Sequence, residues 1–366
     1  MRTTAAVLGG VGAAFETQQV DLAPPHEGEV LVRVAAGGLC ASDLNAVDGK
    51  RTLVPFPAVL GHEAAGVVEA VGPGVTSVRP GDHVVMSIVP SCGACPPCRA
   101  GRPNYCVVAG RAMGAGTLMD GTGRLSLDGE PLHHFLAVSS FAQHAVVPAS
   151  GLCVLPPQMP LDAAALISCA VLTGYGAVRN TADVPPGARV AVIGCGGVGL
   201  NCVQGARLAG ASTIVAVDVT PDKLALARTV GATHVVDAAS DDPVAAIKDL
   251  CGGVDFAFEA LGREATLQQA WLSLDAGGTA VAVGLLAHGA TLTLDAGPLV
   301  NEVTLKGCYF GSSHLARDVP ALVDHYLNGD LLLDEIISHR IGLDDLDAAF
   351  DRMRHGEGAR SVLVLD

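Results

Sequence analysis

The chain has 366 residues, of which half are apolar and only 16% are charged, a composition that excludes an intrinsically disordered protein. Its length predicts two domains, each large enough to enclose a hydrophobic core. The formal net charge of −15 at pH 7 gives a surface that repels phosphate backbones and anionic lipids, so neither nucleic acid nor a membrane is an expected partner.

The first residues, MRTTAAVLGGVGAAFETQQV, resemble a secretory signal only loosely, because glycines break the apolar run and no convincing cleavage site follows. We predict a plain first strand and turn there. The uncharged run Ala163–Val178 falls short of a membrane-spanning helix. Eleven cysteines in a long chain without a signal favour metal binding over disulfides and predict a cytoplasmic protein.

The pattern of elements changes once along the chain. Up to about residue 170, short β-like runs such as EVLVRVAA and DHVVMSIV stand between glycines and prolines, which predicts an antiparallel β domain. After the PPG at 185–187, strands and helices alternate from RVAVIG to TAVAVGL, as in a parallel sheet covered on both faces. Helix signals at 317–327 and 343–354 and the final strand SVLVLD do not continue this repeat.

We therefore predict an α/β protein in which a doubly wound domain is inserted into a β-rich domain. The β-rich domain would cover 1–170 and 311–366, with the C-terminal part packing back on the first. The doubly wound domain would cover 171–310.

Four cysteines lie close together in SCGACPPCRAGRPNYC, a spacing that chance rarely produces. Four thiolates can close a tetrahedral zinc site within one loop, leaving no position for water or substrate. The sequence thus predicts a structural zinc, with an iron–sulfur cluster of unusual spacing or four unliganded thiols as the alternatives. The predicted ligands are Cys92, Cys95, Cys98 and Cys106.

The stretch VAVIGCGGVGL places a glycine-rich turn between a strand and a helix. Its glycines, Gly194, Gly196, Gly197 and Gly199, permit a tight turn and the close approach of backbone to a pyrophosphate. Asp218 ends the next strand, where its carboxylate can accept hydrogen bonds from an adenosine ribose and would repel a 2′-phosphate. This arrangement predicts NAD as the cofactor, and a simple packing turn is the alternative.

Three more residues attract attention: Cys40 in GLCASDLNAVDG, His62 in VLGHEAAG and Cys169 in ISCAVLTGYGA. Each alone is weak evidence, because a single cysteine or histidine is most often an ordinary packed residue. Together with the four-cysteine loop and the glycine turn, and in this order, they resemble the zinc-dependent medium-chain alcohol dehydrogenases nearly from end to end. The resemblance implies a GroES-like catalytic domain, a Rossmann cofactor domain, NAD and two Zn²⁺ per chain.

By this resemblance, Cys40, His62 and Cys169 hold a catalytic zinc whose fourth position is open to water or a substrate oxygen, as Lewis-acid chemistry requires. Asp43 would orient His62, and Glu63 would be the acidic neighbour behind the metal. For both, an ordinary buried or solvated carboxylate is the alternative.

The resemblance also assigns a proton path and contacts to the cofactor. Ser42 would pass the alcohol proton toward the cofactor ribose, although Asn45 stands where many relatives carry a histidine that completes the relay. Thr173 and Val198 would face the nicotinamide, and Lys223 would lie near the adenosine ribose. The remaining implied contacts are Arg360 with the pyrophosphate and the backbone of Val283, Gly284 and Leu285 with the carboxamide.

The stretch between Cys106 and Phe141 is predicted to be a long loop, which resembles that of the animal and plant enzymes and the glutathione-dependent formaldehyde dehydrogenases and favours a homodimer. Ile88, Phe135 and Leu136 would line an apolar substrate channel, which favours bulky aliphatic or aryl primary alcohols. Arg51 and Leu53 match positions that are acidic in the formaldehyde branch.

Two alternatives remain. The chain could be a formaldehyde dehydrogenase that acts on a glutathione-type thiol adduct. It could also be a non-catalytic regulatory or structural protein that binds NAD and zinc, since a fold does not guarantee a reaction.

Overall fold

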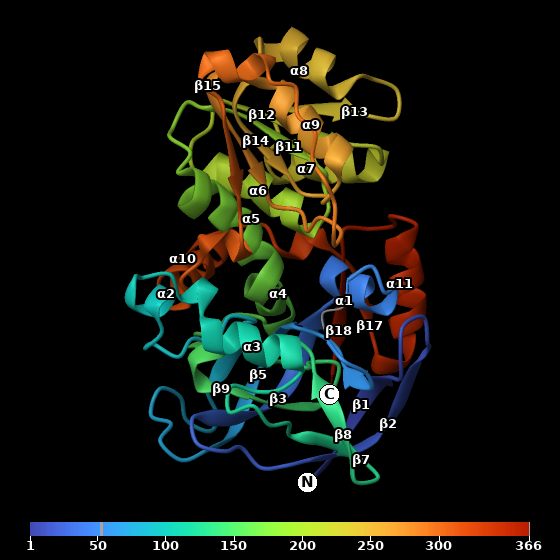
Figure 1. Ribbon diagram of the computed structural model, residues 1–366. Coiled ribbons are helices and arrows are strands. Elements are labelled where there is room, and N and C mark those ends of the chain that lie inside the picture. Colours follow the sequence, from blue (N-terminus) through green and yellow to red (C-terminus); the bar gives the residue numbers. More distant parts are fainter. Residues whose placement is uncertain (52–53, 366) are drawn as a thin grey trace. The chain divides into compact units, whose positions relative to one another are not determined.

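The computed structural model describes residues 1–51 and 54–365 (Figure 1). The chain forms two compact units, which we call unit 1 (Met1–Cys169, His314–Asn328 and Ile337–Asp366) and unit 2 (Ala170–Ser313 and Gly329–Ile336). The return of Gly329–Ile336 to unit 2 was not predicted, because its cause is a side-chain contact. The Gln204 amide accepts from the Leu332 N–H at 2.7 Å and donates to the Leu332 carbonyl at 3.1 Å.

Unit 1 is built from two β layers. A closed barrel runs in the order β1 (Arg2–Leu8), β2 (Phe15–Leu22), β7 (Leu125–Leu127), β8 (Glu130–His134) and β4 (Ala58–Val59). The second sheet runs β10 (Leu152–Val154), β6 (His83–Met86), β5 (Glu63–Val71), β3 (Glu29–Gly38), β18 (Arg360–Val364) and β17 (Ile337–Ile341), with β9 (His144–Pro148) also on β3. Pairing is antiparallel except between β4 and β8 and between β17 and β18, so the predicted antiparallel β domain is confirmed.

Aromatic rings fill the core of the barrel side of unit 1. Phe15 stacks on Phe350 with ring centroids 5.5 Å apart, and Phe141 packs against both rings. Phe350 comes from the C-terminal segment, which explains why this segment returns to unit 1. The helices of unit 1 are α1 (Ala41–Val47), α2 (Pro96–Arg99), η1 (Pro103–Tyr105), α3 (Val107–Ala115), η2 (Ala149–Gly151), α4 (Leu161–Leu166), α10 (Leu315–Leu327), η8 (Leu343–Asp345) and α11 (Leu346–Arg354).

Unit 2 is a parallel six-stranded sheet with helices around it (Figure 1). The strand order is β13 (His234–Asp237), β12 (Thr213–Asp218), β11 (Arg189–Ile193), β14 (Val254–Glu259), β15 (Leu274–Ala282) and β16 (Thr304–Gly307). The chain turns from one side of β11 to the other, and ligands bind at the carboxyl ends of strands at such a switch point. Its helices are α5 (Leu172–Gly176), η4 (Ala177–Ala182), α6 (Gly197–Leu208), α7 (Pro221–Val230), α8 (Pro243–Cys251), α9 (Glu264–Leu272), η5 (Gly297–Asn301), η6 (Phe310–Ser312) and η7 (Asp334–Ile336).

Two local expectations were wrong. The segment after Cys106 was expected to be a loop, but its first residues form α3, which Gly116 ends in a left-handed conformation at φ 69°. The apolar run around Cys169 was expected to be too short to span a membrane, yet the helical stretch Leu161–Ala182 has 22 residues because the π-helical turns η3 (Ile167–Val171) and η4 extend it. Since 78% of its most apolar window is buried inside the protein, this stretch is a core helix.

Candidate metal and cofactor sites

The four-cysteine loop brings its sulfurs together. All four Sγ atoms lie within 4.8 Å of one another, and the sulfur of Cys95 is 3.4 Å from that of Cys98 and 4.0 Å from that of Cys106. Zinc–sulfur bonds of about 2.3 Å in a tetrahedron place sulfurs about 3.8 Å apart. The geometry therefore fits a zinc ion bound by four thiolates, with no position left open.

Local backbone shapes this loop for negative sulfurs. Cys95 donates its N–H to the Cys92 sulfur at 3.4 Å, and Cys92 donates to the Cys106 sulfur at 3.3 Å. A hydrogen bond from the Cys98 backbone lowers the pKa of the Cys95 thiol to about 6, while burial and the neighbouring Cys95 raise the pKa of Cys98 to about 12. The loop alone thus does not favour four thiolates at neutral pH, and a bound cation would be needed to hold them all.

A second cluster gathers Cys40, His62, Glu63 and Cys169, whose ligand atoms all lie within 4.8 Å of one another. Cys40 is the N-cap of α1, His62 and Glu63 stand at the start of β5, and Cys169 lies in η3. Three separate parts of unit 1 therefore converge on one buried point.

The turn before His62 requires a glycine. Gly61 has a φ of +86°, and a Cβ built on it would lie 2.7 Å from the Phe141 nitrogen and 2.6 Å from the Ser140 Oγ. Any other residue would push this turn away from Phe141 and move His62 with it.

Asp43 fixes the His62 ring. Its Oδ1 lies 3.1 Å from His62 Nδ1 and accepts the Gly61 N–H at 3.1 Å, while its Oδ2 accepts the Cys40 N–H at 3.0 Å. Both side chains are fully buried. His62 Nε2 is also buried and has no hydrogen-bond partner among the described residues, which is the arrangement of a ring whose free nitrogen binds a metal.

The two cysteines of this cluster, Cys40 and Cys169, are hydrogen-bonded to each other. Their mutual hydrogen bond lowers the pKa of Cys40 and raises the pKa of Cys169. Two thiolates and a neutral imidazole make a three-ligand zinc site with one open position, and these residues fit that set.

Glu63 and Arg360 form a buried ion pair beside the cluster. The Glu63 Oε1 lies 2.8 Å from Arg360 Nη2, and Arg360 Nη1 donates to the Leu39 carbonyl at 2.6 Å. Burial raises the pKa of Glu63 to about 8 in spite of the opposing effect of Arg360. The Glu63 Oε2 has no partner among the described residues, so it is a further oxygen within reach of a metal.

The glycine turn of unit 2 has close contacts on one side and free space on the other. A Cβ on Gly199 would lie 1.7 Å from the Gly194 carbonyl oxygen, and a Cβ on Gly194 would lie 2.5 Å from Leu261 Cγ. At Gly196, the N-cap of α6, a Cβ would meet nothing within 4 Å. Close packing explains Gly194 and Gly199, whereas Gly196 leaves room beside the first N–H groups of α6, a position that can accommodate a phosphate.

Asp218 is attached to this turn. Its Oδ2 accepts the Cys195 N–H at 2.7 Å, and its Oδ1 accepts the N–H groups of Val219 and Thr220 at 2.8 and 3.0 Å. The carboxylate therefore sits at the carboxyl end of β12, next to the glycine turn.

Comparison with known proteins decides the family. Residues 26–157 match the alcohol dehydrogenase GroES-like domain, and residues 197–328 match the zinc-binding dehydrogenase domain. The chain is 40% identical to an alcohol dehydrogenase class-3 of Myxine glutinosa, over 99% of this chain and 97% of that protein. It is 39% identical to an S-(hydroxymethyl)glutathione dehydrogenase of Paracoccus denitrificans over all of both chains. The chain belongs to the zinc-dependent medium-chain alcohol dehydrogenases.

A solved structure supports the same assignment. Benzyl alcohol dehydrogenase from Acinetobacter calcoaceticus superposes on this dehydrogenase with a TM-score of 0.94 and 35% sequence identity, over 100% of both chains. The predicted fold class, a GroES-like domain with a Rossmann domain, is confirmed, and so are the family, the enzyme class, NAD and zinc.

The structure brings two further predicted residues of this dehydrogenase, Phe135 and Ser42, next to its metal cluster. Phe135 packs its ring edge-on against His62 with centroids 5.6 Å apart, and the Ser42 hydroxyl lies 3.9 Å from the Cys40 sulfur. Ile88 is buried just beyond β6, and Leu136 is half-buried beside Phe135.

The predicted cofactor residues lie in both units, with Arg360 in β18 of unit 1 and the others in unit 2. Arg360 was predicted to contact the pyrophosphate, and in the structure its guanidinium instead pairs with Glu63; the phosphate contact stays a prediction. The predicted residues in or after elements of unit 2 are Thr173 in α5, Gly197 and Val198 at the start of α6, Lys223 in the first turn of α7, and Val283, Gly284 and Leu285 after β15.

The strained turn after Phe135 was not predicted from the sequence. Leu136, Ala137 and Ser139 adopt left-handed φ values of 52°, 58° and 56°, which non-glycine residues rarely do. The Ser139 hydroxyl accepts the Phe135 N–H at 2.9 Å. This strained turn holds Phe135 against His62, and no glycine or proline signals it.

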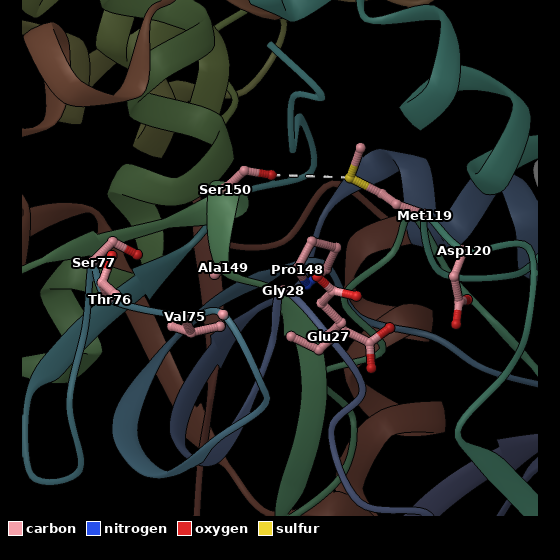
Figure 2. A pocket seen from close by; sticks show the side chains of 12 residues that line it. Glu27, Gly28, Val75, Thr76, Ser77, Met119, Asp120, Pro148, Ala149 and Ser150 are labelled. Carbon is pink, nitrogen blue, oxygen red and sulfur yellow. Dashed lines mark hydrogen bonds between the residues drawn. The ribbon is translucent and has the colours of Figure 1, made fainter. Parts of the chain in front are cut away.

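A hollow of about 380 Å³ elsewhere in unit 1 contains none of the predicted ligands (Figure 2). Glu27, Glu29 and Asp120 line it, and the Ser150 hydroxyl lies 3.9 Å from the Met119 sulfur across one side. Arg124 already pairs with Glu29 at 2.7 Å and with Asp120 at 2.5 Å. Two of these carboxylates, Glu29 and Asp120, are therefore engaged in packing the loop after α3.

Proposed function

We propose that this dehydrogenase oxidises the hydroxymethyl adduct that formaldehyde forms with a low-molecular-weight thiol, with NAD as the hydride acceptor. The observation that carries the proposal is the buried set of two sulfurs and one imidazole, with His62 Nε2 free of any partner among the described residues. Relatives that are 39–40% identical over at least 97% of their length, one of them named S-(hydroxymethyl)glutathione dehydrogenase, support this substrate class.

Each residue of the cluster has a proposed task. Zinc held by Cys40, His62 and Cys169 would supply a Lewis acid that lowers the pKa of the substrate hydroxyl. Asp43 keeps the His62 ring in one tautomer and orientation. The Ser42 hydroxyl, beside Cys40, takes the alcohol proton and passes it on. Glu63, neutralised in part by Arg360, adjusts the charge behind the ligands.

The cofactor is proposed to lie along the carboxyl ends of the strands of unit 2. Asp218 would accept hydrogen bonds from the adenosine ribose, near Lys223, and the N–H groups after Gly196 would bind the pyrophosphate. The nicotinamide would lie between Thr173, Val198 and the backbone at Val283, Gly284 and Leu285.

A second substrate class has its own support. Ile88 and Phe135 are apolar and buried, Leu136 is half-buried, and an aryl alcohol dehydrogenase shares the fold at 35% identity. These observations favour bulky aliphatic or aryl primary alcohols. Of the two residues at the positions that are acidic in the formaldehyde branch, Arg51 is described, and Leu53 lies outside the described residues.

One assay separates the two substrates. NADH formation is followed with formaldehyde alone, with formaldehyde plus glutathione or another small thiol, and with benzyl alcohol and 1-octanol. Turnover of formaldehyde only when a thiol is present supports the adduct. The second class would replace the adduct as the proposed substrate if the enzyme oxidises the bulky alcohols, if added thiol does not improve that turnover, and if no adduct is oxidised. Zinc is counted in the same sample, with two ions per chain expected.

A homodimer is the proposed assembly, formed through the edge strand β16. This strand pairs only with β15 in the described part of the sheet, all four of its residues are exposed, and Val300 beside it is 84% exposed. An open edge of this kind can pair with its own copy around a two-fold axis.

Sedimentation velocity tests this assembly. The protein is expected at twice its chain mass of 36.9 kDa, and Val300→Glu is expected at one chain mass. Leu250→Glu, which adds the same charge at an exposed position of α8, is the matched control and should stay dimeric. A wild-type monomer would contradict the proposal. A cytoplasmic location is proposed from the eleven cysteines, none of which forms a disulfide.

A further inference from the structure

Glu259 is a buried carboxylate that no predicted role uses. It ends β14, is fully buried, and directs Oε1 to four donors on the segment that follows. These are the N–H groups of Leu261, Gly262 and Arg263 at 2.9, 2.8 and 3.4 Å and the Thr266 hydroxyl at 2.7 Å. A single oxygen therefore sets the shape of the segment 260–263 and joins it to the first turn of α9.

One side of this segment packs on the glycine turn. Leu261 fills the space that a side chain at Gly194 would need, with Cγ 2.5 Å from the position of its Cβ. The Ala260 N–H donates to the Ile193 carbonyl at 2.9 Å. The path of the pyrophosphate turn thus depends on where the segment 260–263 lies.

The other side packs on the strand exit at 283–285. A Cβ on Gly262 would lie 2.4 Å from the Leu285 carbonyl oxygen, and a Cβ on Gly284 would lie 2.0 Å from the Gly262 nitrogen. The Glu259 carbonyl itself accepts the N–H groups of Val283 and Gly284 at 2.9 and 2.8 Å. Glu259 thus bonds the segment through its side chain and the strand exit through its main chain, while Ala260, the next residue, bonds Ile193 ahead of the glycine turn.

We propose that Glu259 is a positioning residue for NAD, which fixes the spacing between the pyrophosphate turn at Gly194 and the carboxamide-binding backbone at 283–285. This inference rests on the cofactor placement proposed above. When the carboxylate is removed, the segment 260–263 loses its shape, and the two halves of the cofactor site lose their common register. The affinity should therefore fall for ligands that contact both the pyrophosphate turn and the carboxamide-binding backbone.

The second carboxylate oxygen shows which variant is conservative. Glu259 Oε2 is buried without a partner among the described residues and lies 2.8 Å from where a Cβ of Gly284 would be. In Glu259→Gln the amide oxygen can keep the four donors, and the amide nitrogen takes the place of Oε2. Glu259→Gln should therefore retain most of the function that Glu259→Ala loses.

The experiment compares NADH with ADP-ribose, which lacks the nicotinamide. In Glu259→Ala the affinity for NADH, measured by its fluorescence, is expected to fall about ten-fold, the equivalent of one hydrogen bond to a charged group. The affinity for ADP-ribose, measured by calorimetry, is expected to fall less than about three-fold. Glu259→Gln is expected to recover most of the loss.

A milder pair of variants keeps the test valid if Glu259→Ala does not fold. Thr266→Val removes one donor to Glu259, and Thr229→Val removes a hydroxyl that bonds within α7, to the Ala225 carbonyl at 3.2 Å. Thr266→Val should weaken NADH more than ADP-ribose, and Thr229→Val should change neither. Equal losses for both ligands, or none, would overturn the inference, whereas wild-type protein that binds no NADH would overturn the cofactor placement itself.

Discussion

Asp43 illustrates how much one buried side chain can determine. Its two oxygens hold the backbone of Cys40 and of Gly61 and the ring of His62. These contacts join α1 to the turn before β5, so that two metal ligands far apart in the sequence keep a fixed distance. The carboxylate is the common reference point of the site.

Asp43→Asn is expected to weaken zinc binding at the open cluster about 10- to 100-fold, the range found when partners of metal-bound histidines are lost. An asparagine amide has only one oxygen. In one orientation its NH₂ group faces His62 Nδ1 and the Gly61 N–H, and in the other it faces the Cys40 N–H, so at least one of these contacts is lost. Competition with a chromogenic chelator measures the zinc affinity. Asp48→Asn is the matched control, because Asp48 is the C-cap of the same helix and its side chain bonds Lys50 and Arg354 at the surface. Equal effects of the two variants would argue against this role.

His134 should make stability depend on pH. Its Nε2 accepts the Arg124 N–H at 2.9 Å, and burial first, then the charge of Arg124, lowers its pKa from 6.5 to about 3. Below pH 6.5 the unfolded chain binds a proton that the folded chain does not accept until about pH 3. The free energy of unfolding therefore falls as the pH falls through this window.

From pH 6.5 to pH 5 the loss attributable to His134 is about 2 kcal/mol. His134→Gln offers an oxygen to the same N–H and cannot take up the proton, so its stability should decline less over this range. Urea unfolding at several pH values measures both proteins. Identical slopes would show that His134 does not titrate in this way.

Among the elements, the π-helical turn η3 needs an anchor because it carries Cys169. The Ser168 hydroxyl donates to the Ala165 carbonyl at 2.5 Å and accepts the Ala64 N–H of β5 at 3.1 Å. This hydroxyl connects the helix of one metal ligand to the strand that follows another. Its role was invisible in the sequence, where a serine in an apolar run gives no signal of its partner.

Ser168→Ala leaves the buried Ala64 N–H without its acceptor and should lower the free energy of unfolding by about 1–3 kcal/mol. The hydroxyl lies beside a ligand, so zinc release to a chelator should also become faster. Ser338→Ala is the control, since it removes a hydroxyl that bonds an exposed N–H at 2.8 Å. Unchanged stability and zinc release would contradict the anchoring role.

The four-cysteine loop is expected to depend on its ion. Cys98→Ala should lose one zinc per chain and unfold the loop at moderate temperature, because α2 is a single turn that gains its stability from the ligands. Metal analysis gives the count, and limited proteolysis between residues 91 and 106 reports the loop. Two zinc ions per chain in the variant would exclude the assignment.

The sequence was informative where a pattern is local. The glycine turn, the four cysteines and the alternation of strands and helices after residue 185 each lie within a short stretch, and they predicted the Rossmann sheet and the zinc loop. Contacts between distant residues could not be predicted in this way. The pairing of Arg360 with Glu63, the return of 329–336 and the hub at Glu259 depend on tertiary packing, and α3 was concealed by its glycines.

At the scale of the whole molecule, the metal clusters and the glycine turn belong to different units. All seven cysteines and histidines predicted to bind metal lie in unit 1, and the glycine turn lies in unit 2. A ligand that binds only the folded state stabilises the part that binds it. Zinc and NADH should therefore act on separate parts of the chain.

Trp271, the only tryptophan, makes this measurable because it is buried in unit 2 and donates to the Asp295 carbonyl at 2.8 Å. Chelation should lower the unfolding temperature seen by circular dichroism more than that seen by Trp271 fluorescence. NADH should raise the unfolding temperature seen by Trp271 fluorescence more than that seen by circular dichroism. Identical shifts in both signals would show that the units unfold as one.

The first crossing between the units falls between Cys169 and Ala170, inside η3. Elsewhere a connection can be lengthened with little consequence, but one residue added ahead of this sulfur would rotate it about 100° around the helix axis. Chimeras that exchange the nucleotide-binding half with that of a relative should therefore keep this helix whole and be spliced beyond it. The boundary that is simplest in the fold is the least suitable place to cut the gene.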